Sequence, residues 1–178
     1  MLGYINFLKN KKLDRALPKG LLNAQALGTL KDYRYGLFSF GWCGCEIIAV
    51  YNFLQMLGRP MRLSVIAREI YRYGHVLLGF FGTNVYVLQH FLKKHRVNAL
   101  HTTDKAVFLE HAPKGRCGLV SFWTGKVMRS SIHTVAYRIE PDGSVTVFNR
   151  YNKKDFDHRY ADLREAFAAY PFITASWV

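Results

Sequence analysis

The sequence predicts an α+β protein in which N-terminal helices pack on a C-terminal antiparallel β-sheet. Three observations lead to this fold class. In the first half of the chain, apolar residues recur with the period of a helix. In the second half, two segments alternate apolar and polar residues, and Pro141, Asp142 and Gly143 lie between them in a stretch typical of a hairpin turn.

The length favours a single domain. The chain has 178 residues, which is enough to bury a full core, and it contains no repeat and no long Pro/Gly/Ser linker. Hydrophobic residues make up 50% of the chain and charged residues 21%, a balance that excludes a disordered protein. We therefore expect one domain over residues 1–178, with a helical part at about 1–95 and a mainly β part at about 97–178.

The strongest helical pattern covers residues 46–57. Its apolar residues Ile47, Val50, Tyr51 and Leu54 lie on one side of a helix, and a glycine and a proline follow it. A second helix is expected at 64–73, with Ser64 as its N-cap, and a third at 84–94, capped by Thr83.

The rest of the chain favours strands, with short helices between them. Buried or alternating apolar runs predict the strands, and capping residues and helical spacing predict the helices. In chain order we expect a short strand at 97–101, a helix at 104–111, strands at 118–122, 132–139 and 145–151, a helix at 160–168 and a strand at 172–178.

The two strands of the predicted hairpin can be oriented. His133 shares a strand face with the apolar Val135 and Tyr137, which turns it toward the core and helices, and Asn149 lies on the inward face of the next strand. If the inward faces coincide, a three-residue connection at 141–143 places Asn149 diagonally beside His133. A two-residue turn would instead pair His133 with Asn152 and bury the wrong face, so we reject that register.

A cysteine lies at the predicted start of the first strong helix. Exposed N–H groups and the positive end of the helix dipole favour a thiolate at this position, and Cys45 occupies it better than Cys43. His133 is the best-oriented proton acceptor for that thiol, and the Asn149 amide could orient its ring. Cys117 fits a core position at the start of a strand.

The order and spacing of these residues resemble the papain-like cysteine peptidases. The Gly44-Cys45-Glu46 segment and the apolar helix after it resemble the nucleophile helix of the bacteriocin-processing peptidases, which cleave double-glycine leaders, and of their stand-alone relatives. The Gly-Thr-Asn stretch at 82–84 and Ser-Ile-His-Thr-Val at 131–135, followed by a hairpin ending in Asn149, extend the likeness over residues 41–152.

The resemblance implies a papain-like fold and a peptidase that works through a thioester acyl-enzyme. Cys45 would be the nucleophile, His133 the general base and acid, and Asn149 the orienting residue. It also implies a bacterial protein that needs no cofactor and no metal.

The sequence departs from the family at the oxyanion hole. These peptidases carry a glutamine several residues before the cysteine, but the nearest one here is Gln25, 20 residues before Cys45. Backbone N–H groups and Ser39 are the substitutes we consider, and Trp42 and Gly44 would line the substrate groove.

Other functions remain open. The same triad could pass the acyl group to an amine, as an acyltransferase does, or the domain could be a catalytically inactive module that binds a peptide or partner. A zinc site built from Cys43, Cys45 and nearby histidines lacks the usual paired spacing.

The net charge of +13 favours anionic partners, so a peptide or protein substrate, acidic in particular, is expected. The basic residues are scattered and form no nucleic-acid motif, so we expect no specific nucleic acid. No apolar run reaches the roughly 18 residues needed to span a bilayer, and no secretory signal is evident. Three cysteines suggest a reducing compartment and a cytoplasmic protein. The oligomeric state stays open.

Overall fold

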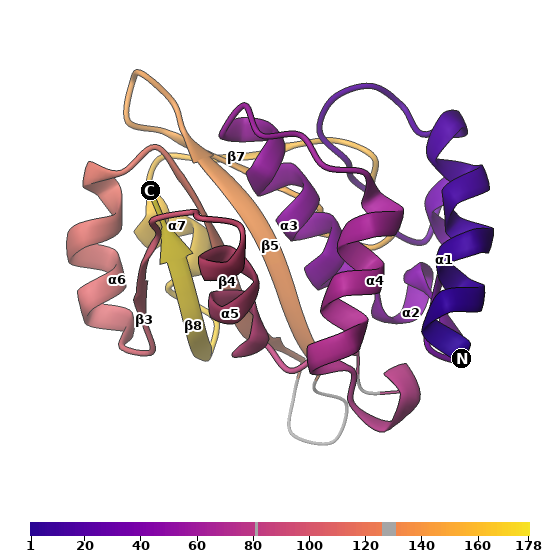
Figure 1. The fold of residues 1–178 in the computed structure, drawn as a ribbon. Coiled ribbons are helices and arrows are strands. Elements are labelled where there is room, and N and C mark those ends of the chain that lie inside the picture. Colours follow the sequence, from indigo (N-terminus) through magenta and orange to yellow (C-terminus); the bar gives the residue numbers. More distant parts are fainter. Residues whose placement is uncertain (81, 126–130) are drawn as a thin grey trace.

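The computed structural model describes residues 1–80, 82–125 and 131–178. It confirms an α+β chain with N-terminal helices and a C-terminal antiparallel sheet (Figure 1). The helices within these residues are α1 (Leu2–Leu13), α2 (Phe40–Cys43), α3 (Cys45–Met56), α4 (Leu63–Gly74), α5 (Val87–Lys94), α6 (Lys105–His111) and α7 (Leu163–Phe167).

The main sheet has the strand order β3-β8-β4-β5-β6-β7, and all its neighbouring strands are antiparallel. A separate two-stranded sheet joins β1 and β2 within the helical half of the chain. The strands are β1 (Arg34–Tyr35), β2 (Phe38–Ser39), β3 (Leu100–Thr102), β4 (Cys117–Thr124), β5 (Ser131–Ile139), β6 (Val145–Phe148), β7 (His158–Tyr160) and β8 (Phe172–Trp177).

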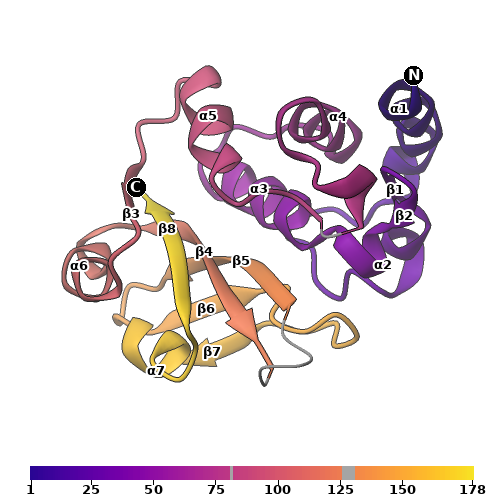
Figure 2. The ribbon, with the colours of Figure 1, turned by 90° about the horizontal axis from the view of Figure 1, so that it is seen from below.

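The central sheet separates two hydrophobic cores. Helices α3, α4 and α5 share one core with Leu119 and Ala136, which lie on the sheet face toward α3. The other face, which includes Val135 and Tyr137, packs under α6 and α7. Figure 2 shows α1, α3 and α4 on one side of the molecule and the sheet with α6 and α7 on the other.

The predicted hairpin register is confirmed. Ala136 pairs with Phe148 and Ile139 with Val145, so the paired residue numbers have an even sum, as a three-residue connection requires. The predicted strand at 145–151 is too long, however, because β6 ends at Phe148. The next residue, Asn149, has a φ of 57°, a left-handed conformation that turns the chain away from the ladder.

Two predicted helix caps are wrong. The N-cap of α4 is Arg62, and the Ser64 hydroxyl donates instead to the carboxylate of Asp14. Helix α5 starts only at Val87, and the Thr83 hydroxyl donates to the Tyr35 hydroxyl. In both cases the hydroxyl forms a hydrogen bond with a residue distant in the sequence instead of capping the helix.

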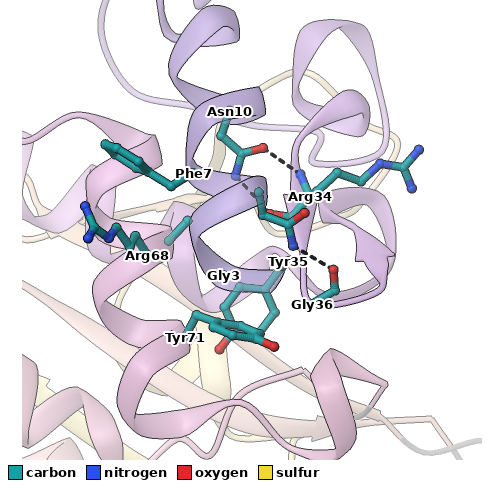
Figure 3. A pocket seen from close by; sticks show the side chains of 10 residues that line it. Gly3, Phe7, Asn10, Arg34, Tyr35, Gly36, Arg68 and Tyr71 are labelled. Atoms are coloured by element: carbon teal, nitrogen blue, oxygen red, sulfur yellow. Dashed lines mark hydrogen bonds between the residues drawn. The ribbon is translucent and has the colours of Figure 1, made fainter. Parts of the chain in front are cut away.

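Helix α1 is held by polar side chains. Asn6 Nδ2 donates to the Gly36 carbonyl at 2.7 Å, and Asn10 bonds both the N–H and the carbonyl of Arg34 (Figure 3). The pocket between α1, α4 and β1 has a volume of only about 10 Å³, too small for a ligand. These hydrogen bonds therefore hold α1 against β1 and the residue after it.

Within the described residues, no helix is long and apolar enough to cross a bilayer.

Candidate functional site

The candidate nucleophile lies at a sharp junction between two helices. Helix α2 ends at Cys43, Gly44 is the N-cap of α3, and Cys45 is the first residue of α3. A Cβ at Gly44 would lie 2.6 Å from the Cβ of Phe40, so only glycine fits this corner. The junction leaves Cys45 half-buried, while Cys43 is buried.

The thiol of Cys45 lies at an open edge of β5. Strand β6 pairs with β5 only from Ala136 to Ile139, so the earlier residues of β5 have no β6 partner on that side. There the Sγ of Cys45 lies 4.0 Å from the carbonyl oxygen of Ile132, and the N–H of Thr134 donates toward it. The sulfur thus contacts the backbone on both sides of His133.

The ring of His133 is anchored at the same edge. Its Nε2 lies 2.7 Å from the carbonyl oxygen of Asn149, the residue at which the chain leaves β6. In the neutral ring this contact assigns the proton to Nε2 and leaves Nδ1 as an acceptor. His133 shares the sheet face of Phe122, whose ring it meets edge-on at 5.9 Å. Its side chain is therefore turned toward the core beneath α6 and α7, the sheet face that Val135 and Tyr137 share.

Asn149 does not orient His133 through its side chain, as we had expected. Its side-chain oxygen accepts from the backbone N–H of Gln25, and its Nδ2 donates to the Gln25 Oε1 at 3.0 Å. The left-handed conformation at Asn149 directs its carbonyl toward the ring and its amide toward the 23–25 segment. The backbone of Asn149 thus takes the role expected of its side chain.

Gln25 enters the site from a distant part of the sequence. It is buried, and its Nε2 lies 3.5 Å from the carbonyl oxygen of Gly41, four residues before Cys45. No local pattern marks this position, because contacts with Asn149 and Gly41 bring it there. The fold therefore supplies a buried glutamine amide close to the start of α3.

Electrostatics make the resting thiol and imidazole neutral. Burial raises the pKa of Cys45 to about 11, although the N–H groups of Thr134, Glu46 and Cys45 itself oppose the shift. Burial likewise lowers the pKa of His133 to about 4, against the effect of its contact with the Asn149 carbonyl. The expectation that the helix start favours a thiolate is wrong for this resting structure, because desolvation outweighs the backbone donors. Among the described residues, no hydrogen bond joins the Cys45 thiol to the His133 ring.

A buried carboxyl group follows the cysteine directly. Glu46 is 2% exposed, and its Oε1 makes no hydrogen bond in the described part of the chain. Burial raises its pKa to about 8, opposed by a hydrogen bond with Thr83. At neutral pH the carboxyl group is therefore mostly protonated, and its ionisation at higher pH further raises the pKa of Cys45.

The other predicted site residues have different surroundings. Trp42 is 64% exposed, and its Nε1 donates to the carbonyl of Phe80, so it lies on the surface beside the α2–α3 junction. Ser39 is the N-cap of α2, and its carbonyl accepts from the Cys43 thiol at 3.3 Å. Burial raises the pKa of that second thiol to about 12. Cys117 is buried in the core.

No group of three or more His, Cys, Asp or Glu side chains suited to a metal ion is found in residues 1–80, 82–125 and 131–178.

Comparison with known proteins adds no relative. No protein-family model matches the chain, and neither a curated protein nor a solved structure does. In this chain the thiol of the helix-start Cys45 contacts the open edge of β5, and the ring of His133, a residue of that strand, is anchored by the Asn149 carbonyl.

Proposed function

We propose that the protein is a cysteine hydrolase, a peptidase of papain-like fold, acting through Cys45 and His133. One observation carries this proposal. The Cys45 sulfur contacts the β5 backbone on both sides of His133, and the ring of His133 is fixed at the same edge through Nε2. This arrangement combines a nucleophile, a base whose Nδ1 is the acceptor nitrogen and a third group that fixes the tautomer.

The neutral resting pair determines how the first step runs. With the pKa of Cys45 near 11 and that of His133 near 4, the thiol keeps its proton until the attack. As Sγ bonds to the substrate carbonyl carbon, the Nδ1 of His133 takes the thiol proton and the carbonyl oxygen becomes an oxyanion. Collapse of this intermediate expels the amine, which receives that proton from His133 and leaves a thioester on Cys45.

Hydrolysis completes the cycle. Water attacks the thioester carbonyl while His133 takes its proton, and the thiol is restored as the acid is released. Transfer of the acyl group to an amine would use the same thioester. The acceptor alone distinguishes a hydrolase from an acyltransferase.

The oxyanion would be stabilised by N–H donors near the start of α3. The backbone N–H of Cys45 is one, since it already faces the sulfur. We assign the side-chain amide of Gln25 as the second donor. Its Oε1 is held by the Asn149 side chain, and its Nε2 makes only a long contact, 3.5 Å, with the Gly41 carbonyl. Such donors typically contribute about 3 kcal/mol to the transition state.

A second candidate is a binding module without catalysis. The observation that favours it is the raised pKa of Cys45 together with the missing hydrogen bond between its thiol and the His133 ring in the described residues. In that case the domain would bind a peptide and leave it intact.

A peptide-cleavage profile tests the proposal. The full chain is incubated with a mixed-sequence peptide library, and new termini are identified by mass spectrometry. We expect cleavage by the wild type and by Cys43→Ala, the matched control, because Cys43 is buried and its thiol bonds the Ser39 carbonyl. Cys45→Ala should abolish cleavage, and His133→Ala should lower it by about 10² to 10⁴.

Cleavage that survives Cys45→Ala would overturn the assignment of the nucleophile. If the wild type binds library peptides but cleaves none, the binding module is the correct function.

A further inference from the structure

A pocket of about 350 Å³ opens beside the candidate base. It lies on the α7 side of the sheet, and none of its lining residues comes from α2 or α3. Its wall includes Phe122, His133, Arg150, Tyr151, Asn152 and Tyr170. The pocket therefore touches the histidine that protonates the leaving group and does not touch the cysteine that keeps the acyl group.

Arg150 is a buried cation with unused donors. It is 6% exposed; its Nη2 donates to the carbonyl of Ala166 at 3.1 Å, and the guanidinium also interacts with the Tyr160 hydroxyl. Its Nε and Nη1 are buried and make no such bond within the described residues. A buried guanidinium normally pairs with a carboxylate, because its desolvation is otherwise costly.

Aromatic rings partly compensate for this burial. The Arg150 guanidinium carbon lies 4.4 Å from the ring centroid of Tyr170 and 5.0 Å from that of Phe122, with Tyr160 and Phe167 just under 6 Å away. Such cation–π contacts and a hydrogen bond with the Tyr160 hydroxyl stabilise the charge, but they supply no carboxylate.

No carboxylic acid among the described residues supplies an acceptor to Arg150. The titratable groups that face Arg150 are His133, His158, Tyr160 and Tyr170, and none is a carboxylic acid. Among the described residues, no ion pair includes Arg150.

We propose that this pocket binds a carboxylate on the leaving-group side of the substrate, with Arg150 as its ligand. A carboxylate can accept two N–H bonds from one guanidinium in a planar, bidentate pair. Tyr170 lines the same pocket and its ring is the nearest to the guanidinium, so a bound carboxylate would displace it. That the carboxylate belongs to the leaving-group side of the substrate rests on the proposed function, whereas the binding of a carboxylate by the pocket does not.

Carboxylate binding would also act on the base. Arg150 helps to lower the pKa of His133, as a positive charge does to a nearby imidazole. A carboxylate paired with Arg150 would cancel that effect and raise the pKa of His133. A substrate with the matching group would thus make its own general base stronger.

Binding to the full-length Cys45→Ala protein tests the inference without turnover. Three N-acetylated tetrapeptides serve as probes: Ala-Ala-Glu-Ala amide, Ala-Ala-Gln-Ala amide and Ala-Ala-Gln-Ala with a free terminal carboxylate. Titration calorimetry gives the affinities, and NMR of labelled histidine rings, with His133 assigned by substitution, gives its pKa. We expect at least one carboxylate peptide to bind about tenfold or more tightly than the all-amide peptide and to raise the pKa of His133.

The two carboxylate peptides show whether the group is a side chain or a chain end, and tighter binding of either supports the proposal. Equal affinity for all three peptides would overturn it. Tighter binding that leaves the His133 pKa unchanged would also overturn it, because the ligand would then bind elsewhere. Because Cys45→Ala cannot form a thioester, this binding test does not depend on cleavage. The proposal of a carboxylate pocket and the proposal of a peptidase can therefore fail independently.

Discussion

Replacing Glu46 by glutamine should change how the stability of the protein depends on pH. The buried carboxyl group has its pKa raised from 4.5 to about 8, so between these values the unfolded chain releases a proton that the folded chain keeps. The stability associated with the protonated group is fully present below pH 4.5 and is lost as pH rises toward 8. Linkage gives a loss of roughly 3 to 4 kcal/mol at most between pH 5 and pH 8. Glutamine does not titrate and should not show this loss.

Urea unfolding of the wild type and Glu46→Gln at pH 5 and pH 8 measures the effect. The free energy of unfolding of the variant relative to the wild type should rise by roughly 3 to 4 kcal/mol at most from pH 5 to pH 8. Any packing cost of the amide is the same at both pH values and cancels in this comparison. The exposed Glu110 provides the control, since Glu110→Gln should show no such change. An equal difference at both pH values for Glu46→Gln would refute the buried, protonated carboxyl group.

Three further changes probe the site. Iodoacetamide labelling of Cys45, located by fragment mass spectrometry, should be roughly a hundredfold slower at pH 7 than labelling of an ordinary thiol, because burial raises the pKa of Cys45 from 9.0 to about 11. The labelling rate should keep rising between pH 8 and 10, and a plateau below pH 7 would contradict the raised pKa. Gly44→Ala should cost about 2 kcal/mol in urea unfolding, because its Cβ would lie 2.6 Å from Phe40, and an unchanged midpoint would contradict the tight corner. Asn149→Gly should lower the acylation rate less than His133→Ala does, since glycine adopts a φ of 57° and retains the carbonyl that holds His133, while Gln25 loses its side-chain anchor; a loss as large as in His133→Ala would show that the side chain orients the base.

The parts of the fold that follow hydrophobic periodicity could be predicted. Helix α3 and the pairing of β5 with β6 agree with the sequence because each buries a clear apolar pattern. Helix α1 was missed for the opposite reason: it buries Asn6 and Asn10 and exposes Tyr4 and Ile5. Its docking depends on amide hydrogen bonds to the backbone of Arg34 in β1 and of Gly36 just after it, which no apolar spacing indicates.

Some features of the candidate site could likewise be predicted from the sequence, and others could not. The positions of Cys45 and His133 follow from a helix start and from strand alternation. The contacts of Asn149 do not, because they depend on one left-handed residue that exchanges the roles of its carbonyl and its side chain. Gln25 depends on a loop brought in from the start of the chain, and the pKa of Cys45 depends on how deeply the folded chain buries the sulfur.

Capture of the acyl-enzyme tests the central claim most directly. The wild type is mixed with an N-acetylated peptide p-nitrophenyl ester, quenched in acid within one turnover and digested, and the modified cysteine is located by fragment mass spectrometry. We predict an acyl group on Cys45, none on the buried Cys43, and formation about 10² to 10⁴ slower in His133→Ala. Acylation of Cys43 instead, or an unchanged rate in His133→Ala, would contradict a nucleophile and base that meet at the open edge of β5.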